Sequence, residues 1–268
     1  MKFSIITPTF NSEKTITRNI QSVIDQTYKN FEQIIVDNLS SDKTIELAKN
    51  LYRDASIINK LIIITEKDNG IADAFNKGIK AATGNIITIL NSDDAYYDNE
   101  ILSEVIEAFN NPQILIVHGD IHFIDSVYGT NIRHPLPTKI MKGVQYNHPT
   151  MFIKRDLYNK IGLYNTGFKV SMDYEFYCRI ALNYDPDKIS VYLKYKPLVK
   201  MYSGGMSWKN ELKSIYEIKK ALMLHDFWNT EGKKFYYTRL YRTKLKKILD
   251  KFKLQSFVKT WRKLKWGN

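Results

Sequence analysis

The chain has 268 residues, of which 44% are hydrophobic, so it can form one α/β domain with a smaller appendage and is not globally disordered. Its single cysteine, Cys178, excludes an intrachain disulfide and fits a reducing compartment. The apolar runs are far shorter than the roughly 20 residues of a membrane-spanning helix, and the N-terminus resembles no signal peptide, so we expect a cytoplasmic protein.

The whole net charge of +12 comes from the C-terminal end of the chain. Residues 1–208 contain 23 Lys and Arg and 23 Asp and Glu, whereas residues 209–268 contain 17 basic and 5 acidic residues. A basic tail on a neutral body favours an anionic surface as the partner of the tail, and the function of the body must be argued separately.

The first ninety residues alternate between strand and helix signals. Apolar and β-branched runs predict strands at Phe3–Thr7, Phe31–Asp37, Leu61–Glu66 and Ile86–Leu90. Apolar residues at helical spacing predict helices between them, the first capped by Ser12, the second by Ser41 or Asp42, and the third extending over residues 71–82. This alternation is typical of a parallel sheet built from β-α-β units.

Acidic residues follow three neighbouring strands of this predicted sheet. Asp37 ends the second strand, Asp68 follows the third, and Asp93 and Asp94 follow the fourth. Ligands of open α/β sheets bind beyond the carboxyl ends of the strands, so the pattern predicts a binding site for a cation or a polar ligand. The alternative is that each Asp caps the helix after it.

Short segments along the chain resemble, in order, the inverting family 2 glycosyltransferases of GT-A fold. They cover roughly residues 3–207 and are Thr7–Asn11, Gln26–Tyr28, Ile34–Asp37, Asp68–Ile71, Asn76–Gly78, Ala82–Gly84, Asn91–Asp94, His148–Thr150 and Asp173–Glu175. The run from Lys67 to Gly84 resembles the branch that builds bacterial exopolysaccharides and lipopolysaccharide O-chains.

The resemblance implies a Rossmann-like GT-A catalytic domain at residues 1–207, with a nucleotide-sugar-binding half (1–95) and an acceptor-binding half (96–207). A basic helical extension would follow at 208–268. The implied reaction is inverting transfer of a hexosyl group from a nucleotide sugar, with UDP-sugars favoured, to a hydroxyl of a glycan or lipid-linked acceptor.

The resemblance places the Asp-x-Asp metal motif of the family on Asn91-Ser92-Asp93. Asp93 would be the principal ligand of Mn²⁺ or Mg²⁺, with Asp94 as second candidate, because hard cations prefer carboxylate and phosphate oxygens. Asn91 replaces an Asp of the motif, which predicts weaker metal binding without nucleotide. The alternative for Asp93 and Asp94 is an Asx-turn.

The same resemblance assigns the donor-binding residues. Asp37 would bind the base or ribose, and Thr7, Pro8 and Phe10 would form the wall beside the base. Lys77 would pair with a phosphate and Asp73 with a hydroxyl, although a solvated helix face also explains Lys77. The full nucleotide-sugar set is Thr7, Pro8, Phe10, Asp37, Asp68, Gly70, Asp73, Lys77, Ser92 and Asp93.

Asp173 matches the general base of the family. It lies at the predicted start of a helix, whose N-terminus should lower the pKa of the carboxyl group. A plain helix cap is the alternative role, and Glu175 is the alternative base. The acceptor or donor-sugar side would contain Asp94, Asp120, His148 and Glu175. His148 could also be purely structural.

Two C-terminal segments carry further expectations. The loop Gly204–Ser207 would close over the diphosphate. Residues 237–266 combine helical apolar spacing with aromatic and basic residues, which predicts an anchor on an anionic membrane, peripheral at the inner face of the cell membrane. Packing on the catalytic domain is the alternative, and no motif supports nucleic-acid binding.

Two rival functions remain from the sequence. Sugar-1-phosphate nucleotidyltransferases share the architecture, but they begin with a Gly-rich, Arg-containing loop that Thr7–Asn11 does not match. A non-catalytic nucleotide-binding or membrane-scaffold module is the other. Asn91 favours it, and the presence of Asp93 and Asp173 argues against it.

Overall fold

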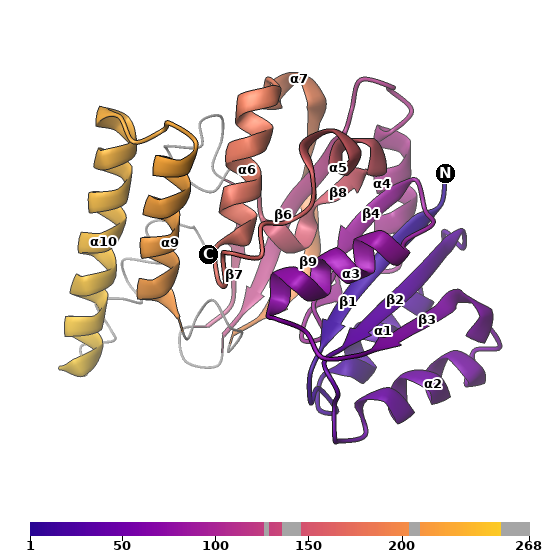
Figure 1. The fold of residues 1–268 in the computed structure, drawn as a ribbon. Helices are drawn as coiled ribbons and strands as arrows, with labels where there is room; N and C mark the ends of the chain where they lie inside the picture. Colours follow the sequence, from indigo (N-terminus) through magenta and orange to yellow (C-terminus); the bar gives the residue numbers. More distant parts are fainter. Residues whose placement is uncertain (126–128, 136–145, 204–209, 253–268) are drawn as a thin grey trace.

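A computed structural model describes residues 1–125, 129–135, 146–203 and 210–252 (Figure 1). The strands are β1 (Phe3–Thr9), β2 (Phe31–Asp37), β3 (Leu61–Thr65), β4 (Ile86–Ile89), β5 (Ala95–Tyr96), β6 (Ile116–Ile124), β7 (Asn131–Arg133), β8 (Phe152–Lys154) and β9 (Ser190–Tyr202). The α-helices are α1 (Ile16–Ile24), α2 (Thr44–Asp54), α3 (Ile71–Ala81), α4 (Ile101–Ala108), α5 (Arg155–Ile161), α6 (Met172–Asn183), α7 (Pro186–Ile189), α9 (Glu211–Leu224) and α10 (Thr230–Lys251). Two short 3-10 helices are η1 (Ile58–Lys60) and η2 (His148–Thr150).

One mixed sheet forms the centre of the molecule. Its strand order is β3-β2-β1-β4-β8-β6-β9-β5, and β7 pairs with β6. The first four strands of this order are parallel, and β8 joins β4 and β6 in antiparallel pairing. In the parallel register Thr9 lies opposite Asp37 and Asp37 lies opposite Thr65, so these strands end at one edge of the sheet.

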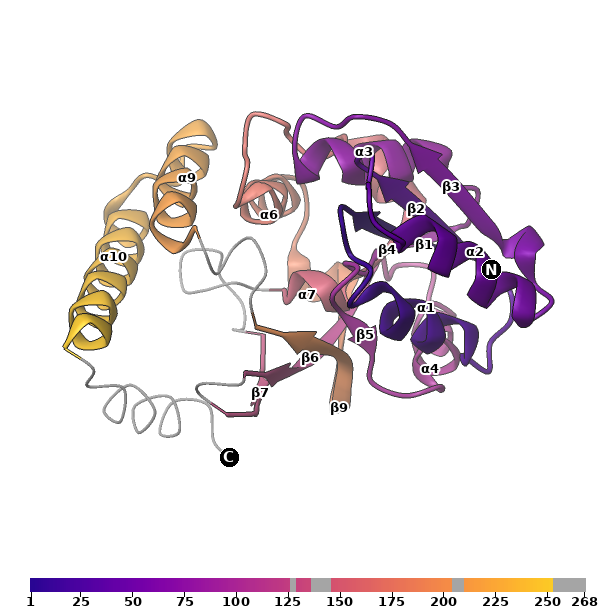
Figure 2. The ribbon, with the colours of Figure 1, turned by 90° about the horizontal axis from the view of Figure 1, so that it is seen from below.

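Helices cover both faces of the sheet, as Figures 1 and 2 show from two directions. The largest core cluster joins one face to α3, α5, α6 and α9, through residues such as Ile6, Phe75 and Phe176. The other two clusters join the opposite face to α1, α2 and α4. Both faces of the parallel strands are therefore buried, which explains why every residue of β1 and β2 is buried.

The predicted α/β fold is confirmed. Strand β2 has the predicted bounds, and β1, β3 and β4 differ from prediction by at most two residues at their ends. The predicted cap at Ser12 is wrong, because α1 starts at Ile16 and Ser12 Oγ bonds Ser92 Oγ at 2.9 Å instead. Likewise Asp37 caps no helix, since α2 begins seven residues later at Thr44.

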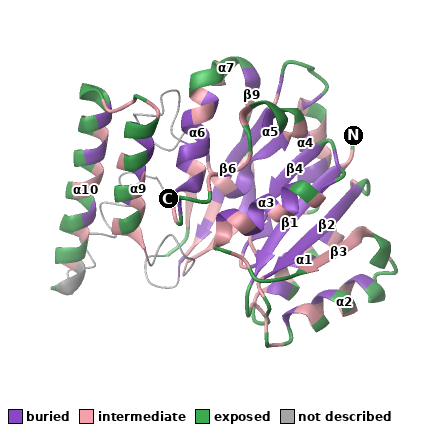
Figure 3. Cartoon of the chain, viewed as in Figure 1, coloured by how far each residue is buried: buried purple, intermediate pink, exposed green. Residues whose placement is uncertain are grey.

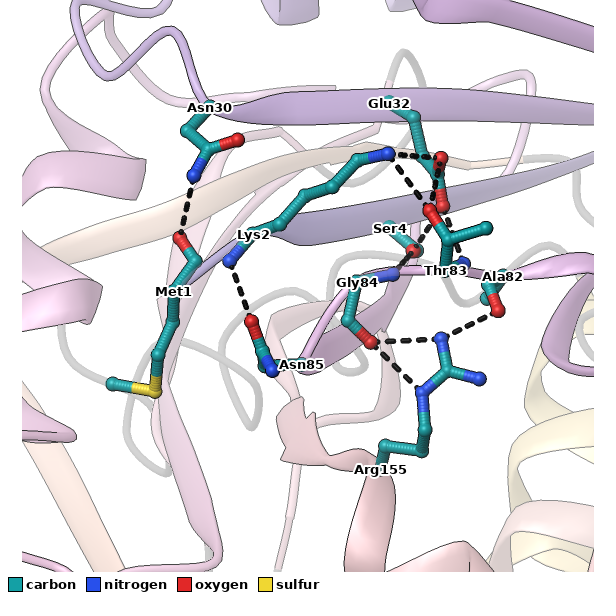
Figure 4. Close-up of polar contacts among 10 residues, drawn as sticks. All are labelled: Met1, Lys2, Ser4, Asn30, Glu32, Ala82, Thr83, Gly84, Asn85 and Arg155. Atoms are coloured by element: carbon teal, nitrogen blue, oxygen red, sulfur yellow. Dashed lines mark hydrogen bonds and ion pairs between the residues drawn. The ribbon is translucent and has the colours of Figure 1, made fainter.

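The segment Ala82–Gly84 is held by a buried network at the opposite edge of the sheet (Figure 4). Glu32 of β2 accepts hydrogen bonds from Lys2 Nζ, Ser4 Oγ and the backbone N–H of Thr83 at 2.5–2.6 Å. A Cβ on Gly84 would lie 2.6 Å from the carbonyl oxygen of Lys2, so only glycine fits there. This part of the family resemblance therefore has a structural role.

The C-terminal helices pack on the rest of the α/β fold. Ile215, Ile218 and Leu222 of α9 and Tyr236 of α10 belong to the same core cluster as α3 and α6. Lys246 of α10 pairs with Glu211 of α9 at 2.9 Å. The described part of the extension thus shares a core with the predicted catalytic domain. Within the described ranges, no helix is both long and apolar enough to cross a membrane.

Candidate active site

The segment Asn91–Asp94 forms a turn directly after β4, at the carboxyl edge of the parallel strands. The backbone N–H of Asp94 donates to the carbonyl of Asn91 at 2.9 Å. Asn19 of α1 stabilises the turn, because its Nδ2 donates to the carbonyls of Asn91 and Asp94 at 2.8 and 3.0 Å. Ser92 is bonded to Ser12. The turn is therefore fixed by α1 and by the loop after β1.

The carboxyl groups of Asp93 and Asp94 interact electrostatically in this turn. Burial, and then the charge of Asp93, raise the pKa of Asp94 well above its usual value, although Asn91 Nδ2 donates to Asp94 Oδ2 at 3.1 Å. Burial also raises the pKa of Asp93. Arg18 of α1 opposes both shifts; it donates to the carbonyl of Asp93 at 2.8 Å and stacks on the ring of Tyr202.

This arrangement fits a divalent cation. A bound cation would favour the ionised forms of the two acids, whose pKa values burial raises. Asn91 Oδ1 is buried beside them without a hydrogen-bond partner among the described residues, and an amide oxygen is also a ligand for hard cations. Over the described residues, no group of three or more His, Cys, Asp or Glu side chains has metal-binding geometry.

The residues predicted to contact the nucleotide base differ in their exposure. Phe10 is 57% exposed just past β1, as a stacking surface requires. Thr7 is completely buried and its Oγ1 accepts from Gln33 Nε2 at 2.9 Å, and Pro8 is also buried in β1. Of the three residues of the predicted wall, Phe10 is therefore the exposed one, and Thr7 and Pro8 are packed within the sheet. Asp37 is buried and accepts from the backbone N–H and Oγ of Ser40, at 3.2 and 2.5 Å.

The loop after β3 is internally bonded. Asp68 Oδ1 accepts from the backbone N–H of Gly70 at 2.8 Å, and Gly70 has a φ of 113°, which favours glycine. Asp73 Oδ2 accepts from the backbone N–H of Asn69 at 3.0 Å. Lys77 pairs with Glu66 at 3.0 Å and with Asp73 at 3.5 Å. A phosphate that binds Lys77 must therefore compete with two carboxylates.

Asp173 lies in the first turn of α6, as predicted. The backbone N–H of Tyr174 donates to its Oδ1 at 2.8 Å. The predicted direction of its pKa is wrong: burial raises the pKa of Asp173, and this outweighs the lowering by His148, the N–H of Tyr174 and Arg239. His148 stacks on Phe75 with ring centroids 5.2 Å apart, and burial lowers the pKa of its imidazole.

Glu175 is a structural carboxylate. It is 1% exposed, and its two oxygens accept from Arg179 Nε and a terminal nitrogen of Arg179 at 3.0 and 2.9 Å. His225 Nε2, in the residue that follows α9, lies 2.9 Å from Glu175 Oε1. Both oxygens of Glu175 are therefore occupied within the core, which argues against its predicted roles as alternative base or acceptor contact.

Asp120 belongs to a separate polar cluster in β6. It is 3% exposed, accepts from Tyr192 Oη at 2.6 Å, and its Oδ2 lies 2.9 Å from His134 Nδ1. The described residues thus give Asp120 two side-chain partners, one of which, His134, is half exposed. The predicted closing loop Gly204–Ser207 lies outside the described residues.

Three residues of this site were not predicted from the sequence: Asn19, Arg18 and Arg239. Asn19 had a visible signal, because it is a polar residue between Ile16, Ile20 and Val23 on the apolar face of α1, where it is completely buried. No sequence signal marked Arg18 or Arg239, because an arginine on a helix is ordinarily a solvated side chain. Only the packing of α1 and α10 reveals that they face acidic residues.

Comparison with known proteins decides the family. The model described as "Glycosyl transferase family 2" matches residues 4–177. The chain belongs to glycosyl transferase family 2. A PGL/p-HBAD biosynthesis glycosyltransferase of Mycobacterium tuberculosis is 31% identical over 210 residues, which are 76% of this chain and 78% of that protein. An uncharacterized glycosyltransferase of Haemophilus influenzae is 30% identical over 159 residues, covering 57% and 62%.

Solved structures share the fold of this family 2 glycosyltransferase. The mannosyltransferase PcManGT from Pyrobaculum calidifontis, in complex with GDP-Man and Mn²⁺, has a TM-score of 0.65 at 15% identity, over 90% of this chain and 69% of that one. S. aureus TarS 1-349 in complex with UDP has a TM-score of 0.62 at 21% identity, over 88% and 70%. The chain therefore has the GT-A fold and is a transferase enzyme.

Proposed function

We propose that the enzyme is an inverting glycosyltransferase with Asp173 as its general base. It would move a sugar from a nucleotide-sugar donor to a hydroxyl of a glycan or lipid-linked acceptor, in the biosynthesis of a bacterial surface polysaccharide. The observation that carries the proposal is the pair of half-buried Asp93 and buried Asp94, which lies after β4 at the sheet edge where Asp37 also ends its strand. Such a pair suits the diphosphate of a nucleotide sugar bound with a cation.

Asp173 has the properties of a base for this reaction. Its Oδ1 accepts from the N–H of Tyr174, so Oδ2 is the oxygen that would take the proton of the acceptor hydroxyl. As that proton leaves, the acceptor oxygen bonds to the anomeric carbon from the face opposite the diphosphate. The bond from the anomeric carbon to the diphosphate oxygen breaks, its electron pair stays on the diphosphate, and the anomeric configuration inverts. Burial, which raises the pKa of Asp173, makes this carboxylate a stronger base.

Asp93, with Asp94 as second ligand, would hold Mn²⁺ or Mg²⁺. The bound cation would neutralise charge on the diphosphate as the bond to the sugar breaks. Arg18 lies beside the two acids and offers a fixed positive charge to the same region. Asn19 holds the turn that carries the acids, so it would keep their oxygens directed at the donor.

A UDP-sugar is the favoured donor. Asp37 would accept from the base or the ribose, and the exposed ring of Phe10 would stack beside the base. Asp68, Gly70, Asp73 and Lys77 would line the sugar and phosphate side, with Asp120 and His148 toward the acceptor. One structural neighbour binds UDP and another binds GDP-Man, so both nucleotides belong in the assay.

An anionic membrane surface is the proposed partner of α10. One stripe along this helix and the residue after it consists of apolar side chains that are 42–69% exposed, at spacings of three and four residues: Tyr237, Tyr241, Leu245 and Ile248 of α10, and Phe252. Tyr236 and Thr243, which are buried, lie on the opposite side of the helix, and Figure 3 shows exposed and buried residues alternating along α10. Exposed cations flank the stripe, among them Lys233, Lys244 and Lys247. This is the composition of an interfacial helix.

Vesicle binding tests the membrane proposal. We expect sedimentation with phosphatidylglycerol vesicles and not with phosphatidylcholine vesicles, and loss of sedimentation in the double variant Tyr241→Ser, Ile248→Ser. Ile58→Ser removes an equally exposed apolar side chain from η1 and is the control. Equal sedimentation of the double variant and the wild type would refute the proposed surface. The predicted anchor extended to residue 266, and residues 253–268 lie outside the described structure.

Transfer to a model acceptor tests the enzymatic proposal. Asp173→Asn should abolish transfer and leave the affinity for UDP unchanged, because the amide cannot take the proton and lies outside the nucleotide site. Transfer by this variant at the wild-type rate would disprove the role of Asp173. A product with retained anomeric configuration, detected by proton NMR, would disprove inversion.

A further inference from the structure

The segment that leads into α6 is held by α9, not by α6 itself. Glu217 of α9 accepts hydrogen bonds from three successive backbone N–H groups, those of Lys169, Val170 and Ser171, at 2.8–3.1 Å. Successive N–H groups of this kind form a nest for an anion, and here the anion is a side chain of the same protein. Asp173 follows two residues later, so the bonds of Glu217 fix the entry of the chain into the helix that carries it.

The ordinary N-terminal cap of α6 is missing. Ser171 occupies the N-cap position, yet its hydroxyl makes no bond to the first turn of α6. Instead Ser171 Oγ lies 2.8 Å from Ser214 Oγ and 3.1 Å from the carbonyl of Ser214, both on α9. A helix whose cap residue is engaged elsewhere depends on other contacts for the position of its first turn. Those contacts come from α9.

The other side of the same segment reaches the donor-binding half. Lys169 Nζ donates to the carbonyl of Asn69 at 2.7 Å, in the loop that contains Asp68 and Gly70. The segment 169–171 is therefore fixed between that loop and α9. A displacement of Glu217 would move the first turn of α6 relative to the donor.

Helix α10 adds a second support from outside. Phe235 stacks on Tyr174, with ring centroids 5.9 Å apart and planes at 18°. Arg239, one helical turn after Phe235, is half-buried and interacts electrostatically with Asp173. Both helices lie beyond residue 177, where the match to the family ends.

We infer that Glu217 is a positioning residue for the reaction, which sets the geometry of Asp173 by holding residues 169–171. The inference rests on the proposed function, in which Asp173 is the base. Misplacement of a reacting group by about 1 Å can cost about 100-fold in rate. Glu217→Ala should therefore lower kcat by about 10- to 100-fold. Glu217→Gln should lower it less, because the amide oxygen still accepts hydrogen bonds. The KM for the donor and the affinity for UDP should stay at wild-type values.

The experiment compares kcat, donor KM and calorimetric UDP affinity for the wild type, Glu217→Ala, Glu217→Gln and Glu231→Gln. Glu231 is exposed in the first turn of α10, so Glu231→Gln controls for the loss of one negative charge from the C-terminal helices. UDP affinity at the wild-type value shows that the variants are folded. Wild-type kcat in Glu217→Ala, or a parallel loss of kcat and UDP affinity in Glu217→Gln, would overturn the inference.

Asp173→Asn, measured beside these variants, separates the two hypotheses. If Asp173→Asn is inactive and Glu217→Ala has wild-type kcat, the positioning role fails and the base stands. If Asp173→Asn is active, the proposed base itself fails.

Discussion

Asn76 of α3 and Tyr164, which precedes α6, form a pair of reciprocal hydrogen bonds between the predicted donor half (1–95) and the predicted acceptor half (96–207). Asn76 Nδ2 donates to the carbonyl of Tyr164 at 2.8 Å, and the backbone N–H of Tyr164 donates to Asn76 Oδ1 at 2.9 Å. Asn76 is 8% exposed. The side-chain amide of Asn76 therefore supplies hydrogen-bond partners to the backbone carbonyl and N–H of Tyr164, at the boundary between the predicted donor and acceptor halves.

Asn76→Ala should destabilise the protein by about 2–4 kcal/mol, because it leaves both backbone groups of Tyr164 buried without a partner. Urea denaturation at neutral pH measures the change in the free energy of unfolding. Lys80→Ala, at an exposed position of the same helix, is the control and should be nearly neutral. Equal stability of the Asn76 and Lys80 variants would contradict this account.

The sheet could be predicted because its signals are local. A buried parallel strand is rich in apolar and β-branched residues, and Ile34–Val36 in the middle of Phe31–Asp37 shows this, with both predicted ends in place. The convergence of Asp37, Asp68 and Asp93 followed from one rule about the carboxyl ends of strands. Ser12 was misread because its hydroxyl bonds Ser92, 80 residues away, and a distant partner leaves no trace in nearby sequence.

The site was predicted only in part for the same reason. Asp173 is recognisable by its place at a helix start. Its raised pKa depends on how much structure covers it, which no local pattern contains. Glu175 was the alternative base, but Arg179 and His225 interact with its carboxylate in the core. In the sequence, Glu217 cannot be told from a solvated acid on a helix. Only the structure shows its hydrogen bonds to the backbone of residues 169–171.

Asp93→Ala should remove the metal dependence of nucleotide binding. Calorimetric titration of UDP into the wild type should give tighter binding with Mn²⁺ than with EDTA, because the cation links Asp93 to the diphosphate. The variant should bind UDP equally weakly in both conditions. Asp54→Asn, an exposed acid at the end of α2, should behave as the wild type. A Mn²⁺ effect of wild-type size in Asp93→Ala would rule out Asp93 as the principal ligand.

Arg239→Gln should move the acidic limb of the pH–rate profile to higher pH. The positive charge of Arg239 lowers the pKa of Asp173, so its removal raises that pKa further, and the ionised base is lost at a higher pH. The other ionisable groups that interact with Asp173 are His148, Tyr164 and Tyr177. They remain in place in the variant.

The profile of Arg239→Lys is the matched control for this shift. Arg239→Lys keeps the positive charge, so the acidic limb of its pH–rate profile should return toward that of the wild type. An unchanged limb in Arg239→Gln would show that Arg239 does not act on the base. A limb moved to lower pH would show that the sign of the interaction is wrong.

Because of Glu32, the stability of the folded protein should depend on pH between about 4.5 and 2. Burial acts to raise the pKa of its carboxyl group, but hydrogen bonds from Lys2, Ser4 and Thr83 outweigh this and lower the pKa to about 2. A carboxyl whose pKa is lower in the folded state stabilises that state fully above its unfolded pKa, near 4.5. The stabilisation is lost as the pH falls toward 2, where the folded protein also takes up the proton.

Glu32→Gln should therefore lose up to about 3 kcal/mol of unfolding free energy at pH 7. It should also show a smaller loss of stability than the wild type as the pH falls from 4.5 to 2. Urea denaturation across this range measures both effects, and Glu46→Gln, an exposed acid on α2, is the control. Parallel stability curves for the wild type and Glu32→Gln would mean that the network at Ala82–Gly84 does not depend on the charge of Glu32. The buried glutamate would then act through packing alone, although its oxygens lie 2.5–2.7 Å from their donors.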